Sequence, residues 1–441
     1  MLGLLVAVAL SPTMMKPPAV RQSPPKELYT YLQTSRAEKD AVLKSVERTE
    51  NSPLQTELKF ESQTWQGIKW NHNILLQQPE RGIANGTAIL FITGDGPRPG
   101  DLNDVKLISA AAGLPVGMLF DVPNQPIWDM KEDDLIAHTF ERYLETRDAS
   151  WPLLFPMAKS ALRAMDVIQA ETAKSANPIR RFVVAGASKR GWTTWFVGCS
   201  RDKRVVGIAP MVIDNLNINA QMPHQLASWG SYSVQIEDYT RRGLQSKLND
   251  ATGNNLARIV DPYSYRENVK APTFIINGGN DPYWTADASS MYWNDLRQPK
   301  WILTVPNAGH SLGNRVQAIE SLGAFARARS VGSNLPVPAG TITSNGSVLT
   351  VRTEAPKFAR KAGPDAFKLS SVTLWTVTST NTDFRAMTWR PAKQIETDSA
   401  TNFELPQPQD RNLAAFVEFR FKSEGRAYSS GTPVQVFKRP N

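Results

Sequence analysis

The sequence predicts an α/β protein with a mostly parallel sheet covered by helices on both faces, followed by a smaller all-β region. Up to about residue 330, short apolar runs that end in glycine or polar loop residues alternate with helix-like stretches, a pattern typical of parallel sheets buried on both faces. After about residue 332, short alternating segments are separated by Asn-Gly, Gly-Pro and serine- or proline-containing turns, which indicates a β-sandwich. The 441 residues are enough for two such regions.

The N-terminal segment, residues 1–25, contains an apolar run from Leu2 to Leu10 and then a proline-rich joint. The run resembles the apolar part of a secretory signal, although no lysine or arginine precedes it, and it is too short to span a bilayer. An exported protein is therefore favoured over the alternative, a disordered or mis-started N-terminus. Residues 26–50 are expected to be helical. Residues 54–79 alternate polar and apolar side chains around Gln66-Gly67, which predicts a hairpin.

Six apolar runs are expected to form the buried strands, and helices are expected at 101–112 and 150–174. About 55 residues between Asp214 and Ala271 form an insertion rich in Gln, Asn, Tyr and Trp, which predicts a helical cap at about 215–270. The expected α/β region is thus 26–332, and the sandwich-like accessory region is 333–441. The six runs are 87–96, 113–123, 180–188, 205–215, 271–281 and 300–310.

One of these runs leads directly into Gly186-Ala187-Ser188-Lys189-Arg190-Gly191. This nearly matches the nucleophile elbow G-x-S-x-G, in which small residues permit a strained turn from strand to helix, but Arg190 replaces the second glycine. Ser188 is the candidate nucleophile. The alternative is that Ser188 only caps the helix beginning at Lys189, a common role for serine.

A serine hydroxyl needs a positioned base, and the base needs a carboxylate to orient it. Asp281 follows one later apolar run in a glycine-rich loop, and His310 follows the next run. This is the chain order Ser, acid, His of the α/β-hydrolase fold, with all three residues at strand carboxyl ends. The alternatives are that Asp281 only forms a turn and that His310 only bonds a loop carbonyl. Asp214, at the end of the preceding run, is the rival acid.

An acyl-transfer site also needs N–H donors for the developing oxyanion. The amide of Lys189 is one candidate, and the second is Gly94 or a neighbour, Thr93 or Asp95, in the loop after an early strand. Aromatic residues near the triad and one histidine of the predicted cap are candidates for the substrate pocket. These pocket candidates are Trp192, Tyr283, Trp284 and His224.

Composition limits the other functions. The net charge is +9, but the 50 basic and 41 acidic residues are interspersed, so no nucleic-acid partner is expected. A single cysteine, Cys199, rules out an intrachain disulfide, and no pair of the four histidines has metal-ligand spacing. No metal, no cofactor and no integral membrane span are therefore expected.

The motifs "GASKRGWTTW", "GGNDPYW" and "PNAGHSL" resemble those of the PhoPQ-activated pathogenicity-related protein family, a bacterial group within the α/β-hydrolase superfamily. The resemblance extends from about residue 27 to the C-terminus, and Arg190 and Trp192 after the serine belong to that family's elbow. It implies an exported location, periplasmic or secreted. It also implies Ser188, Asp281 and His310 as the triad.

The expected function is a serine hydrolase that cleaves an ester or amide bond of a small molecule or peptide through an acyl-enzyme. One alternative is a non-catalytic secreted signalling or binding protein on a hydrolase scaffold, with the C-terminal β region as its contact for protein or glycan. Another is an aminopeptidase-like or sugar-ester-specific enzyme, although the chain lacks the G-W-S-Y-G-G elbow of the related dipeptidase class.

Overall fold

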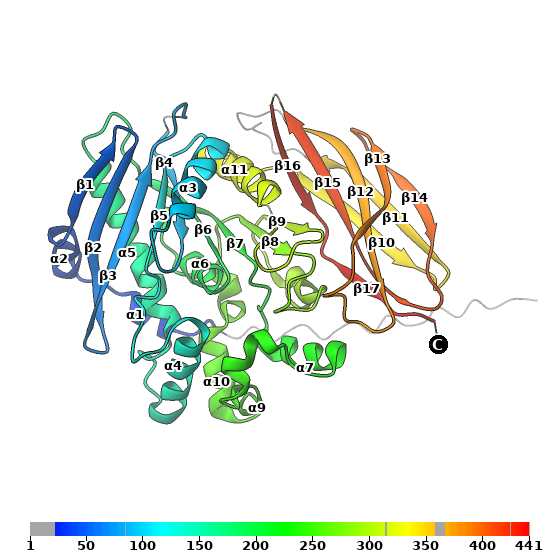
Figure 1. Ribbon diagram of the computed structural model, residues 1–441, viewed down its shortest axis with the longest axis horizontal. Helices are drawn as coiled ribbons and strands as arrows, with labels where there is room; N and C mark the ends of the chain where they lie inside the picture. The colour runs from blue at the N-terminus through cyan, green and yellow to red at the C-terminus, as the bar shows by residue number, and fades with distance from the viewer. Residues whose placement is uncertain (1–22, 84, 314, 358–366, 424, 441) are drawn as a thin grey trace, which may run out of the picture.

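The computed structural model describes residues 23–440 apart from 84, 314, 358–366 and 424, so the signal-like run at Leu2 to Leu10 lies outside the described residues. The α/β region is built on a sheet in the order β1-β2-β3-β5-β4-β6-β7-β8-β9 (Figure 1). Strands β5 to β9 and β4 run parallel, whereas β1, β2 and β3 are antiparallel to their neighbours. The strands are β1 (Glu47–Ser52), β2 (Gln55–Trp65), β3 (Ile68–Gln77), β4 (Thr87–Ile92), β5 (Val116–Leu119), β6 (Arg181–Ala187), β7 (Val205–Met211), β8 (Thr273–Gly278) and β9 (Lys300–Val305).

Helices cover both faces of this sheet, because its central strands are apolar on both sides. Along β6, Phe182 and Val184 pack in one cluster with α5 (Leu154–Thr172) and α6 (Lys189–Cys199). The intervening Val183 and Ala185 pack in a second cluster with α3 (Pro99–Ala112) and α11 (Val316–Ser330). Alternate side chains of a strand point to opposite faces, so one buried run serves two cores. The predicted α/β-hydrolase fold is therefore confirmed.

The N-terminal prediction is partly wrong. Instead of one helical stretch over 26–50, the chain forms two short helices, α1 (Glu27–Leu32) and α2 (Arg36–Lys44), and then enters β1. Ser35 begins α2 with a capping box in which its hydroxyl accepts from the Glu38 amide and Glu38 accepts from the Ser35 amide. The predicted hairpin is confirmed: Gln66 and Gly67, with φ of 48° and 75°, join β2 to β3.

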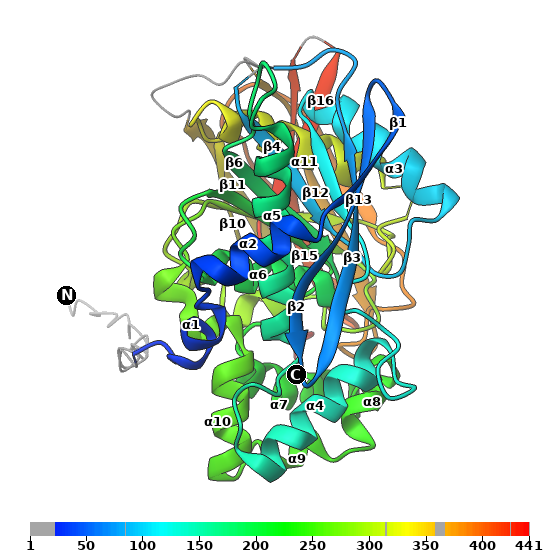
Figure 2. The same cartoon turned by 90° about the vertical axis from the view of Figure 1, so that its left-hand side faces the viewer.

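The insertion between β7 and β8 forms the predicted helical cap (Figure 2). It lies against α4 (Glu132–Thr146), which follows β5, and Tyr239 Oη of the cap donates to Asp133 Oδ1 of α4 at 3.0 Å. Arg242 of the cap pairs with Asp134 and Glu141 of α4. The cap helices are α7 (Ile218–Trp229), α8 (Glu237–Thr240), α9 (Leu244–Lys247) and α10 (Ala251–Val260), with 3₁₀ segments η1 (Val234–Ile236) and η2 (Pro262–Asn268); η3 (Ala288–Met291) and η4 (Trp293–Asp295) follow β8.

The C-terminal region is antiparallel β structure in two facing layers, as predicted. Strands β16-β15-β12-β13 form one layer, with β17 paired to β15, and β10-β11-β14 form the other. Leu349 and Phe403 of the small layer share a core with Leu374 and Phe419 of the large one. The strands are β10 (Val337–Ser344), β11 (Val348–Lys357), β12 (Lys368–Ser379), β13 (Arg390–Glu396), β14 (Asn402–Pro406), β15 (Asn412–Ser423), β16 (Arg426–Gly431) and β17 (Gln435–Phe437).

The large layer is also continuous with the central sheet, which the sequence did not predict. Strand β16 pairs antiparallel with β9, with Gly431 opposite Ile302. Helix α11 adds a second connection, since the Ser321 hydroxyl accepts from the Ser429 amide at 3.1 Å and donates to the Ser429 carbonyl at 3.2 Å. The predicted boundary near residue 332 falls between α11 and β10 and stays a prediction.

Candidate active site

Ser188 lies at the sharp turn between β6 and α6. Its backbone angles, φ 57° and ψ −128°, belong to a strained region that non-glycine residues rarely occupy. Hydrogen bonds hold this conformation: the Ser188 amide donates to the Met211 carbonyl at 2.9 Å, and the Trp192 amide donates to the Ser188 carbonyl at 3.0 Å. Such strain is typical of a nucleophile elbow, in which the turn projects the hydroxyl from the edge of the sheet.

The glycines around Ser188 explain why Arg190 is tolerated where the motif has glycine. A Cβ on Gly186 would come within 2.7 Å of the Arg190 carbonyl oxygen, and one on Gly191 would come within 2.7 Å of Ile213 Cγ2. At these two positions the backbones around the elbow approach each other too closely for a Cβ, so they need glycine. Position 190 contributes its backbone to this contact, and its side chain reaches Val122 and Gly94 in the loops after β5 and β4.

The Arg190 side chain is buried and forms a hydrogen-bonded network with a partly exposed partner, Glu132. Its Nε donates to the Val122 carbonyl at 2.6 Å, and its two terminal nitrogens bind the Glu132 carboxylate at 2.7 and 2.8 Å. The guanidinium lies over Gly94, where any Cβ would collide with it. The position of the Arg190 guanidinium therefore accounts for glycine at position 94, independently of any role of the Gly94 amide as an oxyanion donor.

Glu132 also pairs with the residue that follows the nucleophile. Lys189 Nζ lies 2.8 Å from Glu132 Oε2 and 3.2 Å from Asp133 Oδ2. Burial acts to raise the pKa of Glu132, but the cations of Arg190 and Lys189 outweigh it and hold this pKa well below its usual range. The first turn of α6 is thus fastened to the start of α4 by two cations and two carboxylates.

Asp281 and His310 lie side by side at the carboxyl ends of β8 and β9. His310 Nδ1 is 2.9 Å from Asp281 Oδ2, and the other carboxylate oxygen accepts from the Tyr283 amide at 2.9 Å. The Tyr283 ring stacks on the imidazole with 4.1 Å between centroids. Within the described part of the chain, His310 Nε2 is buried and has no hydrogen-bond partner, Ser188 included. Catalytic hydrogen bonds are often loose without substrate, so this atom is free to receive a proton.

The rival acid, Asp214, is engaged elsewhere. It is buried, and its carboxylate accepts from the Tyr292 hydroxyl, whereas the His310 ring faces Asp281. Burial raises the pKa of Asp214 to about 7, with the nearby Asp281 carboxylate acting in the same direction. The structure therefore pairs His310 with Asp281 and leaves Asp214 as a buried, easily protonated neighbour.

This raised pKa predicts a pH-dependent stability. Because Asp214 titrates near 4 when unfolded and at about 7 when folded, the folded chain binds the extra proton, and stability is lost as the pH rises from about 4 to about 7. Asp214→Asn is neutral throughout. We expect its free energy of unfolding, relative to wild type, to be larger at pH 8 than at pH 5 by at least about 1 kcal/mol. Urea unfolding of both proteins at the two pH values measures this. An equal difference at both values would contradict it.

A cavity of about 100 Å³ opens between Ser188 and the cap. His310, Lys189 and Asp133 border it together with Ser188. Most of the remaining wall is apolar, and its other polar residues are Asn215, Tyr239, Gln245 and Lys247. Three of the pocket candidates, Trp192, Tyr283 and Trp284, line this cavity, and their contact with substrate stays a prediction. The apolar wall includes Phe140, Leu144, Ile213, Ile218, Met222, Ile236, Leu244, Leu248, Leu256, Ala257 and Val260.

Two other candidates behave differently. His224 is not among the residues that line the cavity, because its Nε2 lies 2.8 Å from Asp287 Oδ1, and this pairing raises the pKa of His224. Among the candidate oxyanion donors, the Thr93 amide is already used, since it donates to the Leu119 carbonyl at 2.8 Å. That the amides of Lys189 and Gly94 donate to the oxyanion stays a prediction.

His310 also lines a second, larger cavity of about 410 Å³. Ala187 and Thr93 border it, and its rim holds Asp104 and Arg315, whose charged groups lie 2.5 Å apart. The described residues contain no group of three His, Cys, Asp or Glu side chains placed to hold a metal ion. Within the same residues, no helix has the length and apolarity to cross a membrane.

Sequence reasoning missed Glu132 and Asp133 as parts of this site. They begin α4, far from the elbow in sequence, and their acidic run reads as an ordinary helix N-terminus. Arg190 carried the only available sign. A cation in the place of an elbow glycine requires a carboxylate partner once it is buried.

Comparison with known proteins gives both a family and relatives. The model of the PhoPQ-activated pathogenicity-related protein family matches residues 28–385, ending short of the C-terminus to which the resemblance was expected to extend. Autocrine proliferation repressor protein A of Dictyostelium discoideum is 32% identical over 405 residues, covering 82% of this chain and 80% of that protein.

Two solved structures are also similar to this chain. Each is 15% identical to it, covers 65% of this chain and has a TM-score of 0.43. One is acetyl xylan esterase 1 from Thermoanaerobacterium sp. JW/SL YS485, of which 89% is covered. The other is a puromycin-hydrolyzing peptidase of Mycobacterium tuberculosis, of which 41% is covered. With a family model matching most of its length, the chain belongs to the PhoPQ-activated pathogenicity-related protein family.

Proposed function

We propose that the protein is a serine hydrolase that cleaves an ester or amide bond through an acyl-enzyme. The observation that carries this is the Asp281–His310 hydrogen bond of 2.9 Å beside a strained Ser188, with both Ser188 and His310 bordering one cavity. A purely structural histidine gains nothing from a buried Nε2 without a partner, whereas a general base needs that atom available.

In this mechanism, rotation of the Ser188 side chain brings its Oγ to His310 Nε2, which takes the hydroxyl proton as Oγ bonds to the substrate carbonyl carbon. Asp281 keeps the imidazole oriented and stabilises its charged form. The Lys189 amide, at the first turn of α6, donates to the oxyanion, with Gly94 as the second donor. His310 then protonates the leaving alcohol or amine. In the second half of the reaction, His310 takes a proton from water as the water oxygen attacks the acyl carbon. His310 then returns this proton to Ser188 Oγ as the acid product leaves.

The cavity beside Ser188 supports a short apolar acyl group. A dry cavity of about 150 Å³ lined by aliphatic and aromatic side chains is large enough for benzene, and this one is smaller, at about 100 Å³. Lys189 contributes no free charge to it, because Glu132 and Asp133 neutralise its ammonium. An acyl group of a few carbons fits this volume, and a long one does not.

We expect kcat/KM for p-nitrophenyl esters to rise with acyl length up to about four to six carbons and then to fall. Each buried methylene contributes about 0.8 kcal/mol, or about fourfold in rate, until the cavity is full. Ala257→Leu, which fills the cavity, should move the optimum to shorter chains. Ala227→Leu makes the same change at an exposed site on α7 and should leave the optimum in place. An optimum unchanged by Ala257→Leu would contradict the assignment of this cavity to the acyl group.

The name of the Dictyostelium relative favours a second candidate, a secreted signalling protein that does not use the site. A fluorophosphonate probe separates the two, because it reacts only with an activated serine. Covalent labelling at Ser188 supports the hydrolase, and a folded chain that does not react supports the signalling protein. Screening dipeptidyl amides and sugar-acid esters beside the acyl esters then tests the aminopeptidase-like and sugar-ester alternatives.

Export to the periplasm or the medium is also part of the proposal, supported by the apolar run from Leu2 to Leu10. The C-terminal β region is proposed as a contact surface for protein or glycan. Fractionation of cells expressing the full chain tests the location, and N-terminal sequencing of the recovered protein tests cleavage after that run.

A further inference from the structure

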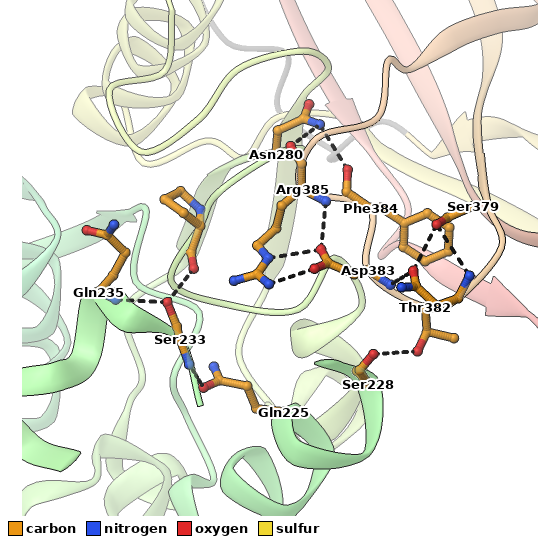
Figure 3. A network of polar contacts seen from close by, with 12 residues as sticks. Gln225, Ser228, Ser233, Gln235, Asn280, Ser379, Thr382, Asp383, Phe384 and Arg385 are labelled. Atoms are coloured by element: carbon orange, nitrogen blue, oxygen red, sulfur yellow. Dashed lines mark hydrogen bonds and ion pairs between the residues drawn. The ribbon is translucent and has the colours of Figure 1, made fainter. Parts of the chain in front are cut away.

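The loop 380–389, which joins β12 to β13, leaves the C-terminal β region and contacts Asn280, directly before Asp281, and Ser228 of the cap (Figure 3). Phe384 and Trp389 anchor it, because both are buried in a small core with Phe416 of β15. This loop contacts three parts of the α/β region, which are the loop carrying Asp281, the loop carrying His310, and the cap.

Its contacts with the Asp281 loop are made by the two residues directly before Asp281. Asn280 Nδ2 donates to the carbonyl oxygens of Phe384 and Arg385 at 3.2 and 3.1 Å (Figure 3), and to that of Met387 at 2.7 Å. Trp389 Nε1 donates to the Gly279 carbonyl at 3.0 Å. The indole is so close that a Cβ on Gly279 would lie 2.8 Å from its nitrogen.

Its contacts with the His310 loop centre on Asn307. Asn307 Nδ2 donates to the Trp389 carbonyl at 2.9 Å, and the Trp389 amide donates to Asn307 Oδ1 at 2.7 Å. The two triad loops also bind each other, since the Asn280 amide donates to the Ala308 carbonyl at 2.9 Å. Trp389 is therefore hydrogen-bonded to both loops at once.

The third set of contacts reaches the cap. Thr382 Oγ1 donates to the Ser228 carbonyl at 2.8 Å, and the Arg385 guanidinium lies 3.9 Å from the centre of the Trp229 ring. The cap in turn holds the chain just after Asp281, since Gln225 Nε2 donates to the Tyr283 carbonyl at 2.9 Å and the Ser233 hydroxyl to the Pro282 carbonyl at 2.7 Å. The Asp281 loop is thus fixed on both sides.

We propose that the loop 380–389 is a positioning element of the active site, with Trp389 aligning the Asp281 and His310 loops and Thr382 fixing the cap. The inference rests on the proposed hydrolase function. Acid and base must keep their relative geometry to within a fraction of an ångström for proton transfer, and neither loop belongs to a strand or helix that would hold it. The C-terminal region therefore contributes to the reaction through residues that do not touch the substrate.

Two matched substitutions test the role of Trp389. Trp389→Phe removes the indole N–H from the Gly279 carbonyl, and Trp301→Phe removes the same group from the Pro336 carbonyl in an equally buried site of β9. We expect Trp389→Phe to lower kcat for a short p-nitrophenyl ester by about 10- to 100-fold with KM nearly unchanged, and Trp301→Phe to leave both constants close to wild type. Asn280→Ala should lower kcat in the same way, which keeps the test open if Trp389→Phe does not fold.

Thr382→Val tests the contact with the cap, because valine keeps the shape and loses the hydroxyl. We expect KM to rise about two- to tenfold, as for the loss of one hydrogen bond, with kcat unchanged. Equal kcat values for Trp389→Phe, Asn280→Ala and Trp301→Phe, in a chain whose Ser188 reacts with a fluorophosphonate, would overturn the positioning role alone. A wild-type chain without that reaction would overturn both this inference and the hydrolase.

Discussion

Ser188→Ala is expected to abolish labelling by a fluorophosphonate probe and to lower kcat for a short acyl ester by about 10⁵- to 10⁶-fold. Without the hydroxyl, no acyl-enzyme forms, and only binding and the oxyanion donors remain to assist water. The substitution should not harm folding, because the elbow is held by the backbone of Ser188 and by Gly186 and Gly191, and none of these is altered. The measurements are gel-based labelling, ester turnover and a thermal melt.

Ser200→Ala is the matched control. Ser200 ends the helix that Ser188 begins. Its hydroxyl donates to the Val197 carbonyl and accepts from the Asp202 amide, and neither partner belongs to the proposed triad, so labelling and turnover should stay at wild-type levels. Labelling that persists in Ser188→Ala would show that another serine reacts. In that case the strained elbow would be structural.

Asp281→Asn should lower kcat by about 10⁴-fold, the loss expected when an amide replaces the carboxylate that fixes the imidazole tautomer. Asn retains the size of Asp and can still accept from the Tyr283 amide, so the loop should keep its conformation. His310 Nδ1 would then lack an anionic partner at the 2.9 Å position. Steady-state kinetics with one ester measure this loss.

Asp214→Asn is the comparison that makes this result specific. Both carboxylates are buried at the ends of neighbouring strands, but Asp214 binds Tyr292 and not His310. The kcat of Asp214→Asn should therefore stay within a few-fold of wild type. The substitution should instead change the free energy of unfolding, with the gain relative to wild type appearing above pH 7. A large loss of kcat in Asp214→Asn together with a small one in Asp281→Asn would exchange the roles of the two acids.

The elements that the sequence predicted well share one property: their evidence is local. A buried run followed by glycine or a polar loop residue identifies the carboxyl end of a parallel strand. In such a sheet those ends lie at one edge. Ser188, Asp281 and His310 could therefore be placed near one another before their distances were known. The Gln66-Gly67 hairpin was equally local, because left-handed backbone angles restrict the residues of a tight turn.

What the sequence could not predict depends on contacts between distant segments. Arg190 meets Glu132, Trp389 meets Gly279, and β16 meets β9, and no periodicity or turn residue records such pairings. The sequence places His224 correctly in the cap, but it does not show whether the side chain faces the pocket. Which way a side chain of the cap faces depends on partners such as Asp287, which comes from another loop.

The continuity of the sheet has a consequence for how the chain is made. Val305 ends β9 and Arg426 begins β16, 121 positions later (426 − 305). At about 5 to 20 residues per second, a ribosome needs about 6 to 24 seconds to synthesise that interval. During that interval β9 lacks its partner β16, so its outer edge is unpaired. An unpaired strand edge is prone to pair with another chain. A nascent chain that stops before β16 should therefore aggregate, and its yield should depend on chaperones that cover this edge.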